Sequence, residues 1–182
     1  MKKNILPLLF VSLIALQSCL NSKYETTPAV MIDPIILVND TDTVTYAFND
    51  DLNQYSTDTL FVGDTVMFAI VYDALGNNLT KAQIRYQPEY ADFSAVLSSQ
   101  LEDVVTRTES DGSFVLDVAT GYRAIIFQFK YIPLKAGLAK LEFRVESDSQ
   151  YSPVEASVLT PIATKPEEDG EGAKDKVDKS EE

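Results

Sequence analysis

Alternating hydrophobic and polar residues predict β-strands over much of the middle of the chain. In Leu138–Glu146 (LAKLEFRVE), Leu141, Phe143 and Val145 fall on one face of a strand and charged residues fall on the other. Because the side chains of a strand point alternately to its two faces, this period of two is typical of a sheet with one buried and one solvated face.

Other segments show the same or a related pattern. Tyr122–Tyr131 also alternates, whereas Thr65–Tyr72 (TVMFAIVY) is apolar on both faces and is expected to lie centrally in a sheet. The remaining candidate strands are Thr43–Phe48, Leu79–Gln87, Ser113–Val118 and Val154–Leu159, with Thr59–Val62 as a short one. Turn residues separate them at Gly63-Asp64, Gly76-Asn77-Asn78, Asp111-Gly112 and Ala136-Gly137. Their short and fairly regular spacing predicts an all-β fold, an antiparallel β-sandwich of about seven to eight strands.

One stretch departs from the strand pattern. In Asp92–Val105 (DFSAVLSSQLEDVV) the apolar residues recur at helical spacing. A short helix that crosses between the sheets is expected here, capped by Ser94 or Asp92. A strand over Leu101–Thr106 is the alternative.

The N-terminal segment has the organisation of a secretory signal. Lys2 and Lys3 precede an apolar run, Ile5–Leu16, of about a dozen residues. A membrane-spanning helix needs roughly 20 apolar residues, so this run fits the hydrophobic region of a cleaved signal peptide.

The residues that follow hold the single cysteine of the chain. Leu16-Gln17-Ser18-Cys19 resembles the lipobox of bacterial lipoproteins. The resemblance implies cleavage between Ser18 and Cys19 and attachment of diacylglycerol to the Cys19 thiol, usually followed by an amide-linked acyl chain. Each buried methylene adds about 0.8 kcal/mol, so two or three chains hold a protein firmly in a bilayer. An ordinary cleaved signal peptide, or a small buried cysteine, is the alternative.

The chain is expected to divide into four parts. Residues 1–18 form the signal peptide, and residues 19–34 form the lipidated N-terminus and a polar tether. Residues 35–164 form the sandwich domain. Residues 165–182 carry eight acidic residues and four lysines and are expected to be a disordered acidic tail.

Composition narrows the possible chemistry. The formal net charge is −13, and loss of Lys2 and Lys3 with the signal peptide leaves 13 basic against 28 acidic residues, a net charge of −15. Such a charge repels phosphate backbones, so no nucleic-acid partner is expected. The chain has no histidine, which removes the usual general base and zinc ligand, and its one cysteine permits no intrachain disulfide.

Two short segments resemble bacterial immunoglobulin-like domains. One is Val62-Gly63-Asp64-Thr65-Val66, and the other is Tyr131-Ile132-Pro133-Leu134-Lys135-Ala136-Gly137 with the alternating strand after it. The resemblance implies an immunoglobulin-like sandwich. It identifies no functional residue, so Cys19 is the only site residue expected from any resemblance.

Acid-rich loops are the candidate metal sites. Asn39–Asp42, Asn49–Asp51 and Glu109–Gly112 could supply the several oxygen ligands that calcium prefers. None fits the calcium-loop frame D-x-[DN]-x-[DN]-G with a closing glutamate, and Asp and Asn also favour turns. No cofactor is therefore expected, with calcium as the open alternative.

Aromatic residues outside the strand faces are the candidate binding residues. Tyr86, Tyr90 and Phe93 cluster near an expected loop, as do Tyr151 and Tyr55 elsewhere. Exposed rings could stack on sugars or anchor a partner protein. Packing at the core or its rim is the plainer interpretation.

No catalytic constellation is present, so the protein is not expected to be an enzyme. A carboxylate pair such as Glu102 and Asp103 could in principle hydrolyse glycosides, but neighbours on a strand face opposite ways. The expected function is a lipid-anchored binding, adhesion or accessory module of the cell envelope, at the outer membrane. Its partners would be the membrane and an envelope protein or glycan. A structural or fimbria-associated component that makes only protein contacts is the alternative.

Overall fold

The computed structural model describes residues 26–166. Within this range the chain forms thirteen strands and one helical turn. The elements are β1 (Ala29–Ile32), β2 (Ile35–Val38), β3 (Asp42–Asn49), β4 (Gln54–Thr57), β5 (Leu60–Phe61), β6 (Val66–Asp73), β7 (Leu79–Arg85), β8 (Ala91–Val96), α2 (Ser99–Glu102), β9 (Val105–Ser110), β10 (Ser113–Val118), β11 (Ala124–Pro133), β12 (Gly137–Ser147) and β13 (Val154–Ala163). No helix in the described range is both long and apolar enough to cross a bilayer.

The strands form one continuous sheet that curls into two layers. Layer A holds β8, β11 and β6, and both β1 and β2 pair with the other side of β6. Layer B holds β9, β10, β7, β12 and β13, with β4 and β5 pairing in parallel with β13. Strand β3 joins the layers because it pairs with β2 on one side and β4 on the other.

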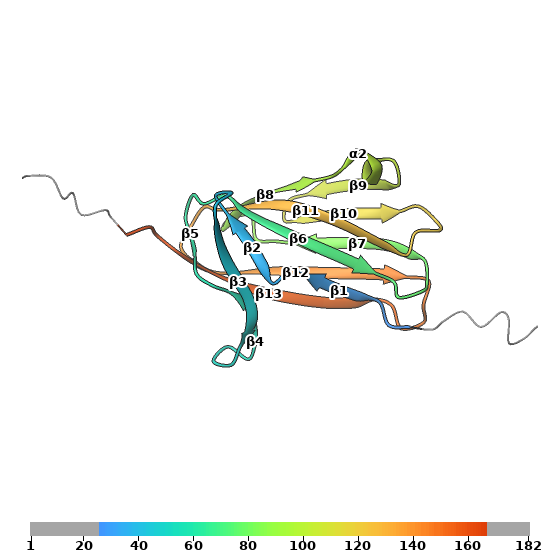
Figure 1. The fold of residues 1–182 in the computed structure, drawn as a ribbon, viewed down its shortest axis with the longest axis horizontal. Coiled ribbons are helices and arrows are strands. Elements are labelled where there is room, and N and C mark those ends of the chain that lie inside the picture. Colours follow the sequence, from blue (N-terminus) through green and yellow to red (C-terminus); the bar gives the residue numbers. More distant parts are fainter. Residues whose placement is uncertain (1–25, 167–182) are drawn as a thin grey trace, which may run out of the picture.

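The fold is therefore an all-β sandwich, as the sequence predicts. It has more strands than the seven or eight expected, because β1, β2, β4, β8 and β9 have only four to six residues each and carry little periodic signal of their own. The described chain begins and ends at opposite ends of the molecule, and the β3–β4 hairpin projects from its body (Figure 1).

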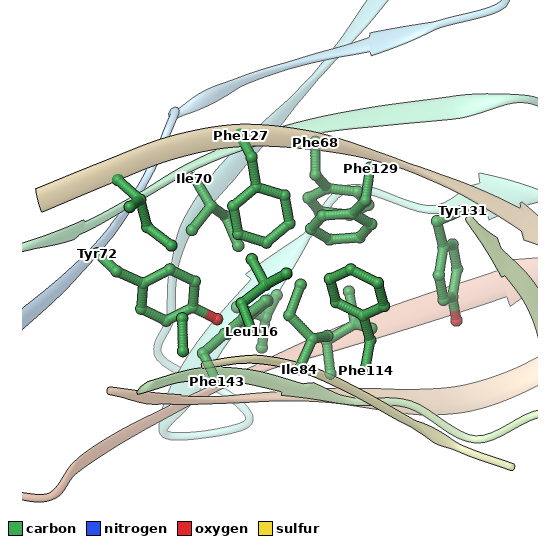
Figure 2. Close-up of a cluster of buried hydrophobic side chains, with 14 of the residues drawn as sticks. Phe68, Ile70, Tyr72, Ile84, Phe114, Leu116, Phe127, Phe129, Tyr131 and Phe143 are labelled. Atoms are coloured by element: carbon green, nitrogen blue, oxygen red, sulfur yellow. The ribbon is translucent and has the colours of Figure 1, made fainter. Parts of the chain in front are cut away.

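The core lies between the layers and is rich in aromatic rings (Figure 2). Phe68 of β6 stacks on Phe129 of β11 with ring centroids 4.9 Å apart. The Tyr72 hydroxyl donates to the Gln83 carbonyl oxygen across the layers, at 2.9 Å. The hydroxyl groups of Tyr131 and Thr160 also meet across the layers, at 3.2 Å. Burial raises the pKa of both phenols, so both stay protonated.

The helix expected within Asp92–Val105 is reduced to the single turn of α2. Ser98 caps it, accepting a hydrogen bond from the Leu101 N–H at 3.3 Å. Ser94 and Asp92 lie instead in β8, which pairs with β11. The alternative strand was also misplaced, since β9 begins at Val105. Pairing with β11 outweighs the local helical spacing, because a strand gains its hydrogen bonds from its neighbour.

The N-terminal boundary of the sandwich lies earlier than residue 35. Residues 29–32, within the segment expected as a tether, form β1 and pair with Ile70–Asp73 of β6. Val30 and Ile32 pack against the core. The expected signal peptide, residues 19–25 of the expected tether and residues 167–182 of the acidic tail lie outside the described residues.

Candidate functional site

Cys19, the residue that the lipobox singles out, lies outside the described residues, so lipidation stays a prediction. The carboxylates of Glu102 and Asp103 lie in and just after α2, both exposed at the surface.

The acid-rich loops serve as turns. Asn39 and Asp40 both have positive φ, and the Thr41 N–H donates to the Val38 carbonyl across them. This is the geometry of a type I′ hairpin turn, which favours Asn and Asp. Among residues 26–166, no group of three or more Asp, Glu, His or Cys side chains could hold a metal ion.

The aromatic cluster near β8 is part of the packing. Tyr86 stacks on Phe93 at 5.0 Å, and Phe93 in turn contacts Phe129 at 4.9 Å. Tyr90 lies under the Lys135 ammonium group and against Gly137. Tyr86 and Phe93, both partly buried, therefore extend the core to its rim.

A different set of aromatic side chains is exposed, on the β3–β4 hairpin. Tyr46 stacks on Tyr55 with centroids 5.1 Å apart, and Phe48 meets the edge of Tyr55 at 5.4 Å. Phe48 is 49% exposed and Tyr55 48% exposed, and Leu52 at the hairpin tip is also exposed. We call Tyr46, Phe48, Leu52 and Tyr55 the aromatic hairpin.

The backbone places these rings side by side. Phe48 pairs directly with Tyr55, so their side chains share one face of the hairpin. The Asn49 carboxamide oxygen accepts from the Leu52 N–H at 3.0 Å, and the Asp50 carbonyl accepts from the Asn53 N–H at 3.3 Å. The loop is thus closed by its own hydrogen bonds, and the rings are held before any partner arrives.

The base of the hairpin is drier than its tip. Burial, followed by the nearby Tyr55, raises the pKa of Tyr46, so this phenol stays neutral. Thr57, which pairs with Tyr46, is buried, and its hydroxyl has no hydrogen-bond partner among the described residues. The rings therefore stand on a packed base and become exposed only toward the tip.

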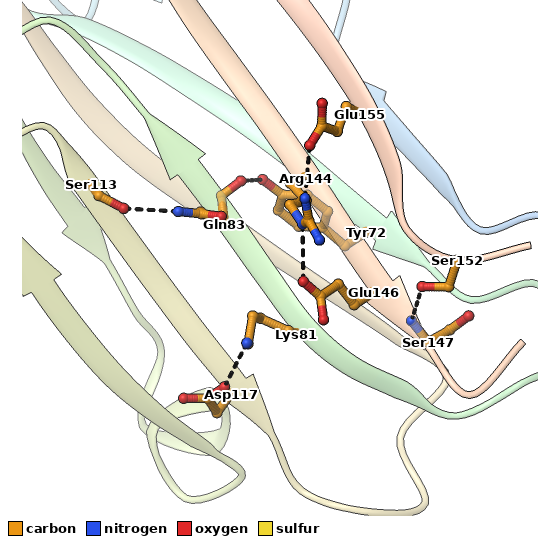
Figure 3. Close-up of polar contacts among 10 residues, drawn as sticks. All are labelled: Tyr72, Lys81, Gln83, Ser113, Asp117, Arg144, Glu146, Ser147, Ser152 and Glu155. Atoms are coloured by element: carbon orange, nitrogen blue, oxygen red, sulfur yellow. Dashed lines mark hydrogen bonds and ion pairs between the residues drawn. The ribbon is translucent and has the colours of Figure 1, made fainter.

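A polar depression of about 170 Å³ lies on the outer face of layer B. Arg144 in it contacts Glu146 and Glu155, each at 2.9 Å (Figure 3). Lys140 contacts Glu142 at 2.8 Å. These charges satisfy one another on a largely solvated surface, which is the ordinary state of the wet face of a sheet.

A second cavity of about 480 Å³ lies where the chain leaves the sandwich, between the β2–β3 turn and Lys165. The Asp64 carboxylate beside it is buried and accepts from Lys165 at 2.7 Å and from Asn39 at 2.9 Å. Burial raises the pKa of Asp64, but these two hydrogen bonds, the positive charge of Lys165 and a backbone hydrogen bond at Phe61 together hold the pKa below its usual value. The group links the β5–β6 turn to the start of the tail.

Comparison with known proteins gives no family. No protein-family model and no curated protein sequence matches the chain. Among solved structures, a DUF4466 family protein from Parabacteroides merdae has 14% identity and a TM-score of 0.42, over 72% of this chain and 44% of that one. The C-terminal domain of the Streptococcus agalactiae AgI/II polypeptide BspA has 15% identity and a TM-score of 0.48, over 75% and 50%.

The major subunit AggA of Escherichia coli aggregative adherence fimbriae has 8% identity and a TM-score of 0.31, over 77% of this chain and 99% of that one. This chain spans about half the length of the first two proteins. No residue role is transferred from any of the three.

Proposed function

We propose that the protein is a non-enzymatic recognition module of the bacterial cell envelope, anchored by lipid at Cys19, that binds a partner protein through the aromatic hairpin. The observation that carries the proposal is the pair of exposed rings, Phe48 and Tyr55, in contact with each other on a projecting hairpin, with Tyr55 stacked on the half-buried Tyr46. The lipobox supports the anchor, and the acidic composition favours solubility of the domain beside a membrane.

The rings suit protein recognition for physical reasons. Aromatic side chains bury a large area for few rotatable bonds, so they lose little entropy when a partner covers them. Contacts between Tyr55 and both other rings restrict their rotamers in advance. The neutral phenol of Tyr46 at the base adds no charge that would have to be desolvated.

The hairpin can be tested by crosslinking in living cells. A photoreactive residue in place of Leu52 should yield a discrete adduct with one envelope protein. Tyr55→Ala in the same chain should abolish the adduct, because it removes the ring that contacts both neighbours. The control is the photoreactive residue in place of Tyr151, which is 53% exposed, against 37% for Leu52, and lies outside the hairpin.

Two outcomes would contradict the proposal. An adduct that survives Tyr55→Ala would show that the rings do not recognise the partner. Glycan-array binding that Tyr55→Ala abolishes, without any protein adduct, would replace the partner protein by a sugar.

A further inference from the structure

The two outer faces of the sandwich differ in chemistry. The outer face of layer B carries the ion pairs of Arg144 and Lys81 with neighbouring acids (Figure 3). Lys140 forms a further ion pair there with Glu142. On layer A the corresponding positions are largely apolar. We call the following side chains the apolar face: Met31, Ile35, Leu37, Met67, Val71 and Ile126.

Strand register places these side chains on either side of Ala69, which pairs with Gln128 of β11 and whose carbonyl oxygen accepts from the Asp33 N–H. Met31 of β1 and Ile126 of β11 both pair with Val71 of β6, so the three form one row across three strands. Leu37 of β2 pairs with Met67 of the same β6. Ile126 is 70% exposed, Met31 47% and Leu37 43%, so these side chains are open to contact from outside the sandwich.

A solvated sheet face would carry polar residues at these positions. Strand β6 lies centrally in its layer, as its sequence predicts, but only its inner face is covered by the core. The charged side chains at this face are Asp33, between Met31 and Ile35, and Lys130, beside Met67. Asp73 lies at the end of β6, and Asp92 lies on edge strand β8. Several large apolar side chains exposed on one sheet face are typical of a surface that contacts a protein or a membrane.

The length of chain between Cys19 and the first strand favours contact with a membrane over contact with a protein. Cys19 lies ten residues before Ala29, a span of at most about 35 Å when fully extended. Strand β1, the first to follow, contributes Met31 to the apolar face. A domain tethered at Cys19 therefore holds this face within reach of the bilayer, whereas the acidic chain would repel a second copy of itself.

We infer that the apolar face of layer A lies on the surface of the membrane that holds Cys19. The inference rests on the proposed lipid anchor. The domain then lies along the bilayer on layer A, with layer B and its ion pairs toward water. Lys130 can extend its ammonium group to the headgroups while its stem stays on the apolar face.

This orientation leaves the aromatic hairpin available. Along β3, Thr43 and Thr45 share a face with Leu37 and Ile35, with which they pair. Tyr46 and Phe48 alternate with them and lie on the opposite face of the strand. A domain seated on its apolar face therefore has its recognition rings directed away from the lipid.

A single tryptophan can report the contact, because the chain has none. The mature chain is coupled through its Cys19 thiol to a maleimide lipid in phosphatidylcholine vesicles. Ile126→Trp should then show blue-shifted emission and severalfold stronger quenching by brominated phosphatidylcholine than Thr108→Trp, a control on exposed strand β9 of layer B. Adding Met31→Glu should reduce the quenching of Ile126→Trp to the control level.

Equal quenching at the two positions, or none at either, would overturn the inference. So would a blue shift of Ile126→Trp that depends on protein concentration and not on brominated lipid, because it would assign the face to a second copy. Circular dichroism of each variant establishes that the fold is kept. Since the tether is supplied chemically, the result does not depend on acylation of Cys19 in cells, which fatty-acid labelling tests separately.

Discussion

Buried hydroxyl groups show how individual residues raise or lower the stability of the sandwich. The Tyr72 hydroxyl is satisfied by the Gln83 carbonyl, and that of Tyr131 by Thr160. The Thr57 hydroxyl is buried at the base of the hairpin with no partner among the described residues. A satisfied hydrogen bond contributes about 1 kcal/mol, whereas a buried unsatisfied group costs about 1–3 kcal/mol.

Two substitutions at buried hydroxyl groups should therefore affect the free energy of unfolding differently. Tyr72→Phe should lower the free energy of unfolding by about 1 kcal/mol, because it leaves the Gln83 carbonyl without its donor. Thr57→Val should leave it unchanged or raise it by up to about 1 kcal/mol. Urea unfolding followed by circular dichroism measures both, and a clear loss of stability in Thr57→Val would show that its hydroxyl is used.

Asp64 should make the stability of the folded protein depend on pH. Its pKa is lower in the folded state than in the unfolded chain, because Lys165 and Asn39 donate to its carboxylate. The stability it contributes is therefore present above the unfolded pKa of about 3.9 and is lost as pH falls through the folded value. Asp64→Asn should lose less stability than wild type between neutral pH and strong acid. Parallel acid unfolding curves for the two proteins would contradict this assignment.

Among the elements, two turns contain a glycine with positive φ but differ in how closely the glycine is packed. Gly63 and Gly112 have φ of +84° and +72°, which side chains disfavour. A Cβ on Gly63 meets nothing within 4 Å, whereas one on Gly112 would lie 2.8 Å from the Tyr86 carbonyl oxygen. The β9–β10 turn is thus packed against the end of β7, and the β5–β6 turn is open.

Substituting each glycine with alanine should distinguish the cost of backbone strain from the added cost of a steric clash. Gly63→Ala should cost about 1–2 kcal/mol from backbone strain alone. Gly112→Ala should cost distinctly more, since the Tyr86 backbone cannot move aside without disturbing its hydrogen bond to Gly112. Thermal or urea unfolding compares the two variants, and equal losses would show that the close approach at Gly112 has no energetic consequence.

Elements with strong alternation were predictable, and short elements held by their neighbours were not. The pattern located β10 at Ser113–Val118, and it located β6 and β12 to within a few residues. It missed β1, whose four residues gain their hydrogen bonds from β6. In residues 92–105 the helical spacing is an accident of a strand, a capped turn and the start of another strand following one another.

The aromatic hairpin was predictable only in part. The sequence predicts Tyr55 as a candidate binding residue, but it places Phe48 only at the end of the candidate strand Thr43–Phe48. The alternation in β3 is real, yet the core does not extend to the end of that strand, so Phe48 is left exposed. Its pairing with Tyr55 depends on the register with β4, a strand of four residues with no periodic signal.

At the scale of the whole molecule, three surfaces are proposed to face three different environments. The apolar face of layer A would lie on the bilayer, the charged face of layer B would lie in water, and the aromatic hairpin would meet a partner. All three assignments place the domain next to a membrane, and that placement comes from the acylation proposed for Cys19. Lipid at this position is the central claim.

Metabolic labelling with a radioactive fatty acid tests that claim most directly. Wild-type protein and a Cys19→Ala variant are expressed in the same bacterial host, purified and compared at equal amounts. The account predicts label in the wild-type protein, on a chain that begins at Cys19, and none in the variant. Equal label in both proteins, or an unlabelled mature chain with a free thiol, would contradict it.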